Sequence, residues 1–105
     1  MAERPGIRNA AADELFRAVL ALRDLDECYA FFEDLCTMKE IADMSQRRAA
    51  ARMLLEGRTY EQIVKSVEIS TATISRINRC IQYGSGGYRQ TLDRLRPQDP
   101  SPEAE

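Results

Sequence analysis

The chain has 105 residues, of which 44% are hydrophobic and 30% charged, and its formal net charge is -2. This length fits one domain with a modest core, and the four prolines near the two ends leave the middle free to be helical. No apolar stretch is long enough to span a membrane, and the N-terminus lacks the apolar core of a signal peptide. We therefore expect a cytoplasmic protein without a membrane partner.

Histidine is absent, and the three cysteines, Cys28, Cys36 and Cys80, show no Cys-x-x-Cys spacing. Zinc sites are built mostly from these two residue types, so we expect no metal site. The cysteines are predicted to be reduced thiols packed in the core, where free cysteine behaves as a small hydrophobic side chain. Without histidine or a clustered carboxylate pair there is no visible acid–base arrangement, and we do not expect an enzyme.

The charges are distributed unevenly along the chain. Residues 1–45 contain five basic and ten acidic side chains, and residues 46–96 contain ten basic and four acidic ones. Residues 97–105 contain three acidic side chains and no basic one. This asymmetry predicts that one face of the protein contacts a polyanion while the remainder is repelled from it.

Apolar residues recur at spacings of three and four, which predicts an all-α fold. The first helix is expected over about residues 9–22. A second helix follows directly, with Asp24 or Asp26 placed to accept hydrogen bonds from its first amides. Both helices have wide apolar faces, which are larger than a short chain readily covers. A homodimer would cover them, whereas the alternative is a compact monomer with an ordinary core.

Cap residues divide the rest of the chain into shorter helices. Thr37 and Glu40 form a capping box, Ser45 is expected to cap a new helix, and Gly57 to end it in a left-handed conformation. The expected helices cover residues 38–44, 46–56, 60–67, 71–83 and 88–95. We expect residues 1–8 to be flexible, residues 9–95 to form the domain, and the acidic, proline-rich residues 96–105 to be disordered.

Residues 59–83 have the pattern of a helix-turn-helix motif. The first helix presents Ile63, Val64 and Val67, Ile69 fills the turn, and the second helix is anchored by Ile74, Ile77 and Ile81. Many such motifs have glycine at the end of the first helix. Here the residue is Glu68, so we expect a turn without a strongly left-handed residue.

The polar face of the second helix suits the major groove of DNA. Small residues at its start allow the backbone to approach base edges, and arginines further along can reach guanine or phosphate. The predicted DNA-binding residues are Ser70, Thr71, Ala72, Thr73, Ser75, Arg76 and Arg79, together with Tyr60 and Lys65 on the first helix. The stretch "GSGG" after this helix lacks the Lys-Ser/Thr of a phosphate loop, so we interpret it as a flexible link flanked by the packing residues Tyr83 and Tyr88.

The sequence "LLEGRTYEQIVKSVEISTATISRINRCIQYGSGGYRQTLDRL" resembles the Trp repressor superfamily, and more closely its YerC/YecD-type branch. The likeness is strongest in "ISTATISR" and "YGSGGY" and extends over most of residues 10–95. It implies a Trp-repressor-like helical bundle that forms an intertwined homodimer with two helix-turn-helix heads. Its implied function is that of a sequence-specific transcriptional regulator, in the first place a repressor, with double-stranded DNA as the partner.

The resemblance also places a possible effector pocket at Arg47, Arg76 and Thr37, since these positions match the residues around the tryptophan corepressor. In the Trp repressor itself a glycine follows the second arginine and leaves room for the indole ring, whereas this chain has Ile77. Adding bulk to a packed site costs roughly 1 to 3 kcal/mol. We therefore expect no cofactor, and in particular no binding of L-tryptophan.

One alternative function belongs to a different class. The same helices could form a dimeric protein-interaction module without direct DNA readout. A partner bound independently of salt, together with no shift of any duplex, would distinguish this module from a DNA-binding regulator.

Overall fold

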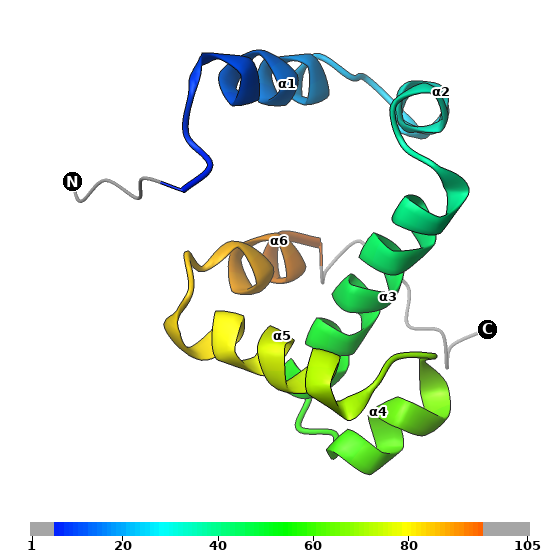
Figure 1. The fold of residues 1–105 in the computed structure, drawn as a ribbon, viewed down its shortest axis with the longest axis vertical. Coiled ribbons are helices and arrows are strands. Elements are labelled where there is room, and N and C mark those ends of the chain that lie inside the picture. Colours follow the sequence, from blue (N-terminus) through cyan, green and yellow to red (C-terminus); the bar gives the residue numbers. More distant parts are fainter. Residues whose placement is uncertain (1–5, 96–105) are drawn as a thin grey trace. The chain divides into compact units, whose positions relative to one another are not determined.

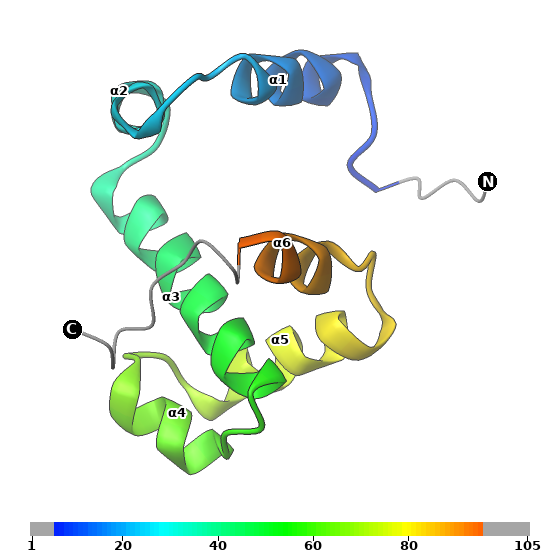
Figure 2. The same ribbon diagram turned by 180° about the vertical axis from the view of Figure 1, so that it is seen from behind.

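The computed structural model describes residues 6–95 as six α-helices without a strand in that range (Figures 1 and 2). The helices are α1 (Ala10–Leu20), α2 (Leu25–Leu35), α3 (Met38–Leu55), α4 (Tyr60–Ser66), α5 (Thr71–Tyr83) and α6 (Gly87–Leu95). The predicted all-α fold is confirmed. The chain divides into two compact units that meet at Lys39 and Glu40, and the single domain over residues 9–95 stays a prediction. The predictions for residues 1–5 of the flexible segment and for residues 96–105 lie outside the described residues.

In the first unit, α1 and α2 both begin at a side-chain cap. The Asn9 Oδ1 atom accepts a hydrogen bond from the Ala12 backbone N–H at 2.8 Å. Asp24, one of the two predicted caps of α2, accepts from the Glu27 N–H at 2.9 Å. The Glu27 carboxylate accepts in return from the Arg23 N–H, also at 2.9 Å. These oxygens satisfy amides that have no partner within the helix, and they fix both starting points.

The apolar faces of α1 and α2 are largely exposed in the described part of the chain. No residue of either helix is buried. The rings of Phe31 and Phe32 contact each other edge to face, with centroids 5.5 Å apart. Six large apolar side chains are exposed by 37% to 82%, namely Leu15, Phe16, Leu20, Leu25, Tyr29 and Leu35. These side chains form the apolar faces that the sequence predicts for the two helices, and the homodimer that would cover them stays a prediction.

The three thiols are free, as predicted, but the prediction that they pack in the core is wrong. Cys28 and Cys36 are half-buried, although α2 has no buried residue. Cys80 is exposed because it lies beside, and not on, the buried face of α5. Cys28 lies in α2, whereas Cys36 follows its last residue with an extended backbone, so the placement of both cysteines on one side of a helix stays a prediction.

Helix α3 differs from the prediction of two helices, over residues 38–44 and 46–56. It is one continuous helix, and Ser45 does not cap a new one. The Ser45 hydroxyl instead donates a hydrogen bond to the Ile41 carbonyl oxygen at 2.8 Å. Serine inside a helix can satisfy its hydroxyl in this way without interrupting the backbone ladder, and so the local cap signal was misleading.

Helix α3 ends as predicted at Gly57, which has a φ of 88°. The Gly57 N–H donates to the Leu54 carbonyl at 3.0 Å, and the Arg58 N–H donates to the Met53 carbonyl at 3.0 Å. This pair of bonds is the Schellman arrangement, in which a residue with positive φ lets two terminal carbonyls find partners. Glycine adopts that backbone without a steric penalty, so the chain reverses here toward α4.

The core of the second unit lies between α3, α4, α5 and α6. Helix α5 contacts both α4 and α6, and Figure 1 shows it between them. Each helix contributes buried apolar side chains, namely Ala50, Ala51, Met53, Ile63, Ile74, Ile77, Ile81 and Leu92. This core fixes α4 and α5, which form the helix-turn-helix motif.

Candidate nucleic-acid interface

Helix α4 is short, and its start is fixed by a reciprocal capping box. The Gln62 N–H donates to the Thr59 hydroxyl oxygen at 3.1 Å, and the Thr59 N–H donates to the Gln62 side-chain oxygen at 2.9 Å. The helix buries Ile63 completely. Val64 was predicted to face the core with it, but this is wrong because the Val64 side chain is 42% exposed. A helix of two turns has a narrow buried stripe, which Ile63 fills.

The turn between α4 and α5 is formed without a left-handed residue. Val67 has a φ of -129°, and no residue other than glycine has positive φ in the described part of the chain. The Ile69 N–H donates to the Val67 carbonyl at 2.9 Å, which closes a three-residue turn around Glu68. The expectation drawn from Glu68 is confirmed. Val67 and Ile69 pack against the core, so the apolar filling of the turn is also as predicted.

Helix α5 has the predicted bounds. The Thr73 N–H donates to the Ser70 hydroxyl oxygen at 3.1 Å, which caps its first turn. At the other end the Gly84 N–H donates to the Cys80 carbonyl at 2.8 Å. A Cβ atom at Gly84 would collide with that same carbonyl oxygen, so the space at this position requires glycine. Both ends of α5 are therefore specified by local chemistry.

One side of α5 is apolar and the opposite side is open to solvent. Ile74, Ile77 and Ile81 are at most 7% exposed. Most of the predicted DNA-binding residues are exposed, namely Ser70, Thr71, Ala72, Ser75, Arg76 and Arg79. Thr73 is half-buried, and its hydroxyl lies 3.0 Å from the Ser70 hydroxyl. The structure thus brings these residues to one helix but gives Thr73 a part in the cap.

The exposed side of α5 is electrically positive. The helix contains no acidic residue, and Arg76 and Arg79 have no ion-pair partner within residues 6–95. The N-terminus of a helix adds a partial positive charge because its first amides lack partners. This arrangement attracts anions, and phosphate groups in particular.

The two residues predicted on the first helix of the motif lie at its opposite ends. Tyr60 is the first residue of α4 and is half-buried against the core. Lys65 is in the last turn and is exposed. Tyr60 therefore has a packing function whatever its hydroxyl contacts, whereas the Lys65 ammonium is available to solvent.

The residues of the possible effector pocket belong to both units. Arg47 on α3 is half-buried and Arg76 on α5 is exposed, and both lie in the second unit. Thr37 lies in the first unit, so the pocket stays a prediction. Ile77, the residue that follows Arg76, is 3% exposed and belongs to the core.

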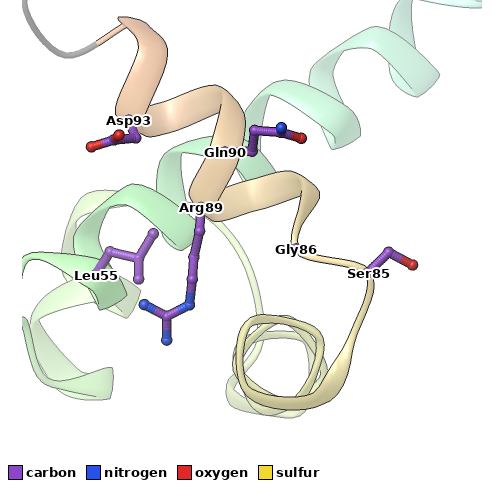
Figure 3. A pocket seen from close by; sticks show the side chains of 6 residues that line it. All are labelled: Leu55, Ser85, Gly86, Arg89, Gln90 and Asp93. Atoms are coloured by element: carbon purple, nitrogen blue, oxygen red, sulfur yellow. The ribbon is translucent and has the colours of Figure 1, made fainter. Parts of the chain in front are cut away.

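A groove of another kind lies between the end of α3, residues 85–86 and α6 (Figure 3). Its lining residues are Leu55, Ser85, Gly86, Arg89, Gln90 and Asp93. Arg89 extends from α6 toward α5, and its Nε atom donates to the Ile81 carbonyl at 3.4 Å. The last carbonyls of a helix lack partners within it, so this guanidinium caps the C-terminus of α5. No signal in the sequence predicted this contact.

Two absences hold for residues 6–95. No group of three or more histidine, cysteine or acidic side chains is placed to hold a metal ion. None of the helices there has both the length and the apolar content needed to cross a bilayer.

Comparison with known proteins identifies relatives that match almost the whole described chain. The family model described as Trp repressor protein matches residues 10–96. A Bacillus subtilis (strain 168) protein described as "Uncharacterized protein YerC" is 50% identical over 90 residues, which are 86% of each chain. The crystal structure of a TrpR-like protein from Eubacterium eligens ATCC 27750 is 49% identical, with a TM-score of 0.84 over 88% of this chain and 95% of that one.

A second solved structure, from Staphylococcus aureus, is 46% identical with a TM-score of 0.84, and the match covers 91% of this chain and 96% of the other. The resemblance noted in "ISTATISR" and "YGSGGY" is thereby confirmed in both sequence and fold. The chain belongs to the Trp repressor protein family, a family of regulators.

Proposed function

We propose that this protein is a sequence-specific DNA-binding transcriptional regulator, acting as a repressor, in which α5 enters the major groove. The observation that supports this most directly is the exposed side of α5. Small residues occupy its first turn, Arg76 and Arg79 follow without an ion-pair partner among residues 6–95, and three buried isoleucines hold the opposite side against the core. The family to which the chain belongs is the second support.

The order of residues along α5 suggests that its N-terminal end lies nearest to the DNA bases. Thr71 and Ala72 are small enough to let the backbone come close to base edges, and their methyl groups suit contact with a thymine methyl. Arg76 lies one turn further along and is long enough to reach guanine or phosphate. The Ser70-capped amides of the first turn and the Lys65 ammonium suit phosphate oxygens.

We propose that the working form is a homodimer built from α1 and α2. The exposed apolar side chains of these helices are too numerous for a stable isolated surface, and a second copy offers the same apolar surface in return. Two copies would present two α5 helices to a roughly palindromic operator. Half-sites should then lie about 34 to 36 Å apart, which is one helical turn of DNA.

We also propose that L-tryptophan is not an effector of this protein. Ile77 occupies the position where the Trp repressor itself has glycine, and its side chain is part of the core. An indole ring beside Arg76 would have to displace that side chain. Calorimetric titration with L-tryptophan at millimolar concentration should give no binding heat, and a saturable heat would refute this part of the proposal.

The central experiment is selection of bound duplexes from a random pool by the full chain. The expected result is an enriched, roughly palindromic sequence. If six to ten phosphates are contacted, affinity for that duplex should fall on the order of a thousandfold between 50 and 200 mM salt. Arg76→Ala should weaken binding by about tenfold or more, because an arginine contact to a base contributes about 1 to 3 kcal/mol.

Arg23→Ala is the matched control, because it removes an exposed arginine of the first unit. It should leave both duplex affinity and selectivity unchanged. Failure of the wild-type chain to enrich any duplex, together with a partner protein bound independently of salt, would replace DNA readout by the interaction-module alternative. Equal binding by the Arg76→Ala variant and the wild type would refute the assignment of α5.

A further inference from the structure

Tyr83 is the last residue of α5, and its side chain is 81% exposed. The prediction that it packs is therefore wrong. Tyr88, the other tyrosine beside the glycine-rich link, does pack against the core and is half-buried. The two residues have identical side chains and lie five positions apart. The difference arises because Tyr88 lies near Leu92 on the buried side of α6, whereas Tyr83 lies opposite the isoleucines of α5.

Tyr83 lies on the same ridge of α5 as the proposed DNA-binding residues. Positions 72, 76, 79 and 83 follow spacings of four, three and four, which in a helix of 3.6 residues per turn line up along one side. That side is opposite to Ile74, Ile77 and Ile81. The ridge therefore runs from Ala72 through two arginines, which form no ion pair within the described part of the chain, to an exposed tyrosine.

The length of the ridge places its two ends at different levels of a bound duplex. Eleven residues separate Ala72 from Tyr83, which corresponds to a rise of about 16 Å. The major groove is about 12 Å wide and about 8.5 Å deep. If Ala72 is at the base edges, Tyr83 is then at the rim of the groove, where the phosphate backbone lies.

We propose that Tyr83 is a further DNA-contacting residue, whose hydroxyl donates a hydrogen bond to a backbone phosphate at the rim of each half-site. This inference rests on the proposed function of α5. The phenol suits that position because its hydroxyl is a donor and its ring can lie against a sugar. As a phosphate contact, Tyr83 would fix the depth and direction of α5 in the groove without distinguishing sequences.

The salt dependence of DNA affinity distinguishes a neutral hydrogen-bond donor from an arginine. An arginine that contacts phosphate releases counterions, so its removal lowers the slope of log K against log salt by about 1 for each contact. A tyrosine hydroxyl releases none. Its removal should therefore weaken binding by a similar factor on all duplexes and at all salt concentrations.

The test compares Tyr83→Phe with the wild-type chain on a duplex that the wild type has selected from a random pool. The expected result is a loss of affinity on the order of tenfold, the usual effect of losing a hydrogen bond to a charged group, with an unchanged salt slope. Tyr83→Ala should lose more because the ring is also removed. Gln90→Ala is the matched control, since Gln90 is also exposed but lies on α6, outside the ridge, and it should bind as the wild type does.

Three results would overturn the inference. One is equal affinity of the Tyr83→Phe, Tyr83→Ala and wild-type chains. Another is a lower salt slope for Tyr83→Phe, which would indicate rearranged arginine contacts. The third is dissociation of the assembly by Tyr83→Ala in sedimentation equilibrium, which would place the ring in a contact between copies.

These results are distinguishable from failure of the proposed function. If Arg76→Ala abolishes duplex binding while both Tyr83 variants bind as the wild type does, α5 binds DNA and only the role of Tyr83 is wrong. If the wild-type chain selects no duplex, the proposed function and this inference fail together.

Discussion

The two units of the chain place the same kind of amphipathic helix in opposite situations. In the second unit, α3 to α6 turn their apolar faces toward one another, and eight residues are buried. In the first unit, α1 and α2 leave side chains such as Leu20 and Leu25 more than 70% exposed. The apolar periodicity of α1 and α2 is similar to that of α5 and α6, so it reveals which face of a helix is apolar but not what covers that face.

This difference separates two functions of the fold. The second unit has a core of its own, which holds α5 with its polar ridge outward. In the first unit α1 and α2 contain no buried residue, and their apolar surface is the proposed contact for a second copy. Substitutions in the first unit should therefore change self-association. Substitutions in the second unit should change the unfolding free energy or DNA binding.

The largest effect is expected from Leu20→Gln in α1. A fully buried leucine contributes about 1.5 to 3 kcal/mol, and a symmetric contact loses two of them. The free energy of dimerisation should fall by about 3 to 6 kcal/mol, as measured by sedimentation equilibrium.

Val64→Gln is the control for that measurement, because Val64 is also an exposed aliphatic residue but belongs to the second unit. It should leave the dimerisation constant unchanged. If the two variants behave alike, or if the wild-type chain is monomeric at millimolar concentration, the exposed face of α1 is not a subunit contact.

The next largest effect is expected from Ile74→Ala, which removes a side chain that is 0% exposed. Truncation of a buried isoleucine to alanine costs about 2 to 5 kcal/mol, since it combines lost burial with a cavity. Urea denaturation of the dimer should show this loss, while the dimerisation constant of the folded chain stays near that of the wild type. A loss below about 1 kcal/mol would mean that the neighbouring side chains of the second unit move to fill the cavity.

The sequence predicted α5 to the residue because both of its ends are determined locally. Ser70 accepts from an amide three positions away, and Gly84 is needed for space at the other end. The prediction that Ser45 caps a new helix was wrong for a related reason. A serine hydroxyl can cap a helix or bond back to the carbonyl four residues earlier, and the choice depends on whether the helix continues.

The site was less predictable wherever a side chain's surroundings come from another part of the chain. The exposed face of α5 followed from the spacing of its isoleucines alone. Val64 and Tyr83 were misplaced because only the packing of α4 and α5 decides how wide each buried stripe is. The contact of Arg89 with α5 was missed because it depends on how the glycine-rich link directs α6.

A smaller effect is expected from Ser70, where stability and DNA binding can be separated. Ser70→Ala removes the acceptor of the Thr73 N–H and should lower the unfolding free energy by about 1 kcal/mol. Ser70→Asp restores an acceptor and should keep stability near that of the wild type. Its negative charge would face the same phosphates that α5 is proposed to approach, so duplex affinity should fall most for this stable variant. Equal duplex affinity of Ser70→Asp and wild type would contradict a DNA contact at the start of α5.

The smallest effect is expected from Arg89→Met, which tests how firmly α6 is held to the end of α5. The Arg89 Nε atom lies 3.4 Å from the Ile81 carbonyl oxygen, a long contact for a hydrogen bond. A cation at a helix C-terminus adds about 0.3 to 1 kcal/mol, and α5 has no basic residue of its own in its last turn. Methionine keeps most of the aliphatic length, so a loss within that range would measure the charge and the hydrogen bond, with Arg94→Met on the same helix as the control. If the two variants lose the same unfolding free energy, the Arg89 contact does not stabilise the packing of α6. The apolar contacts of Leu92 and Tyr88 would then be sufficient to hold α6 against the core of the second unit.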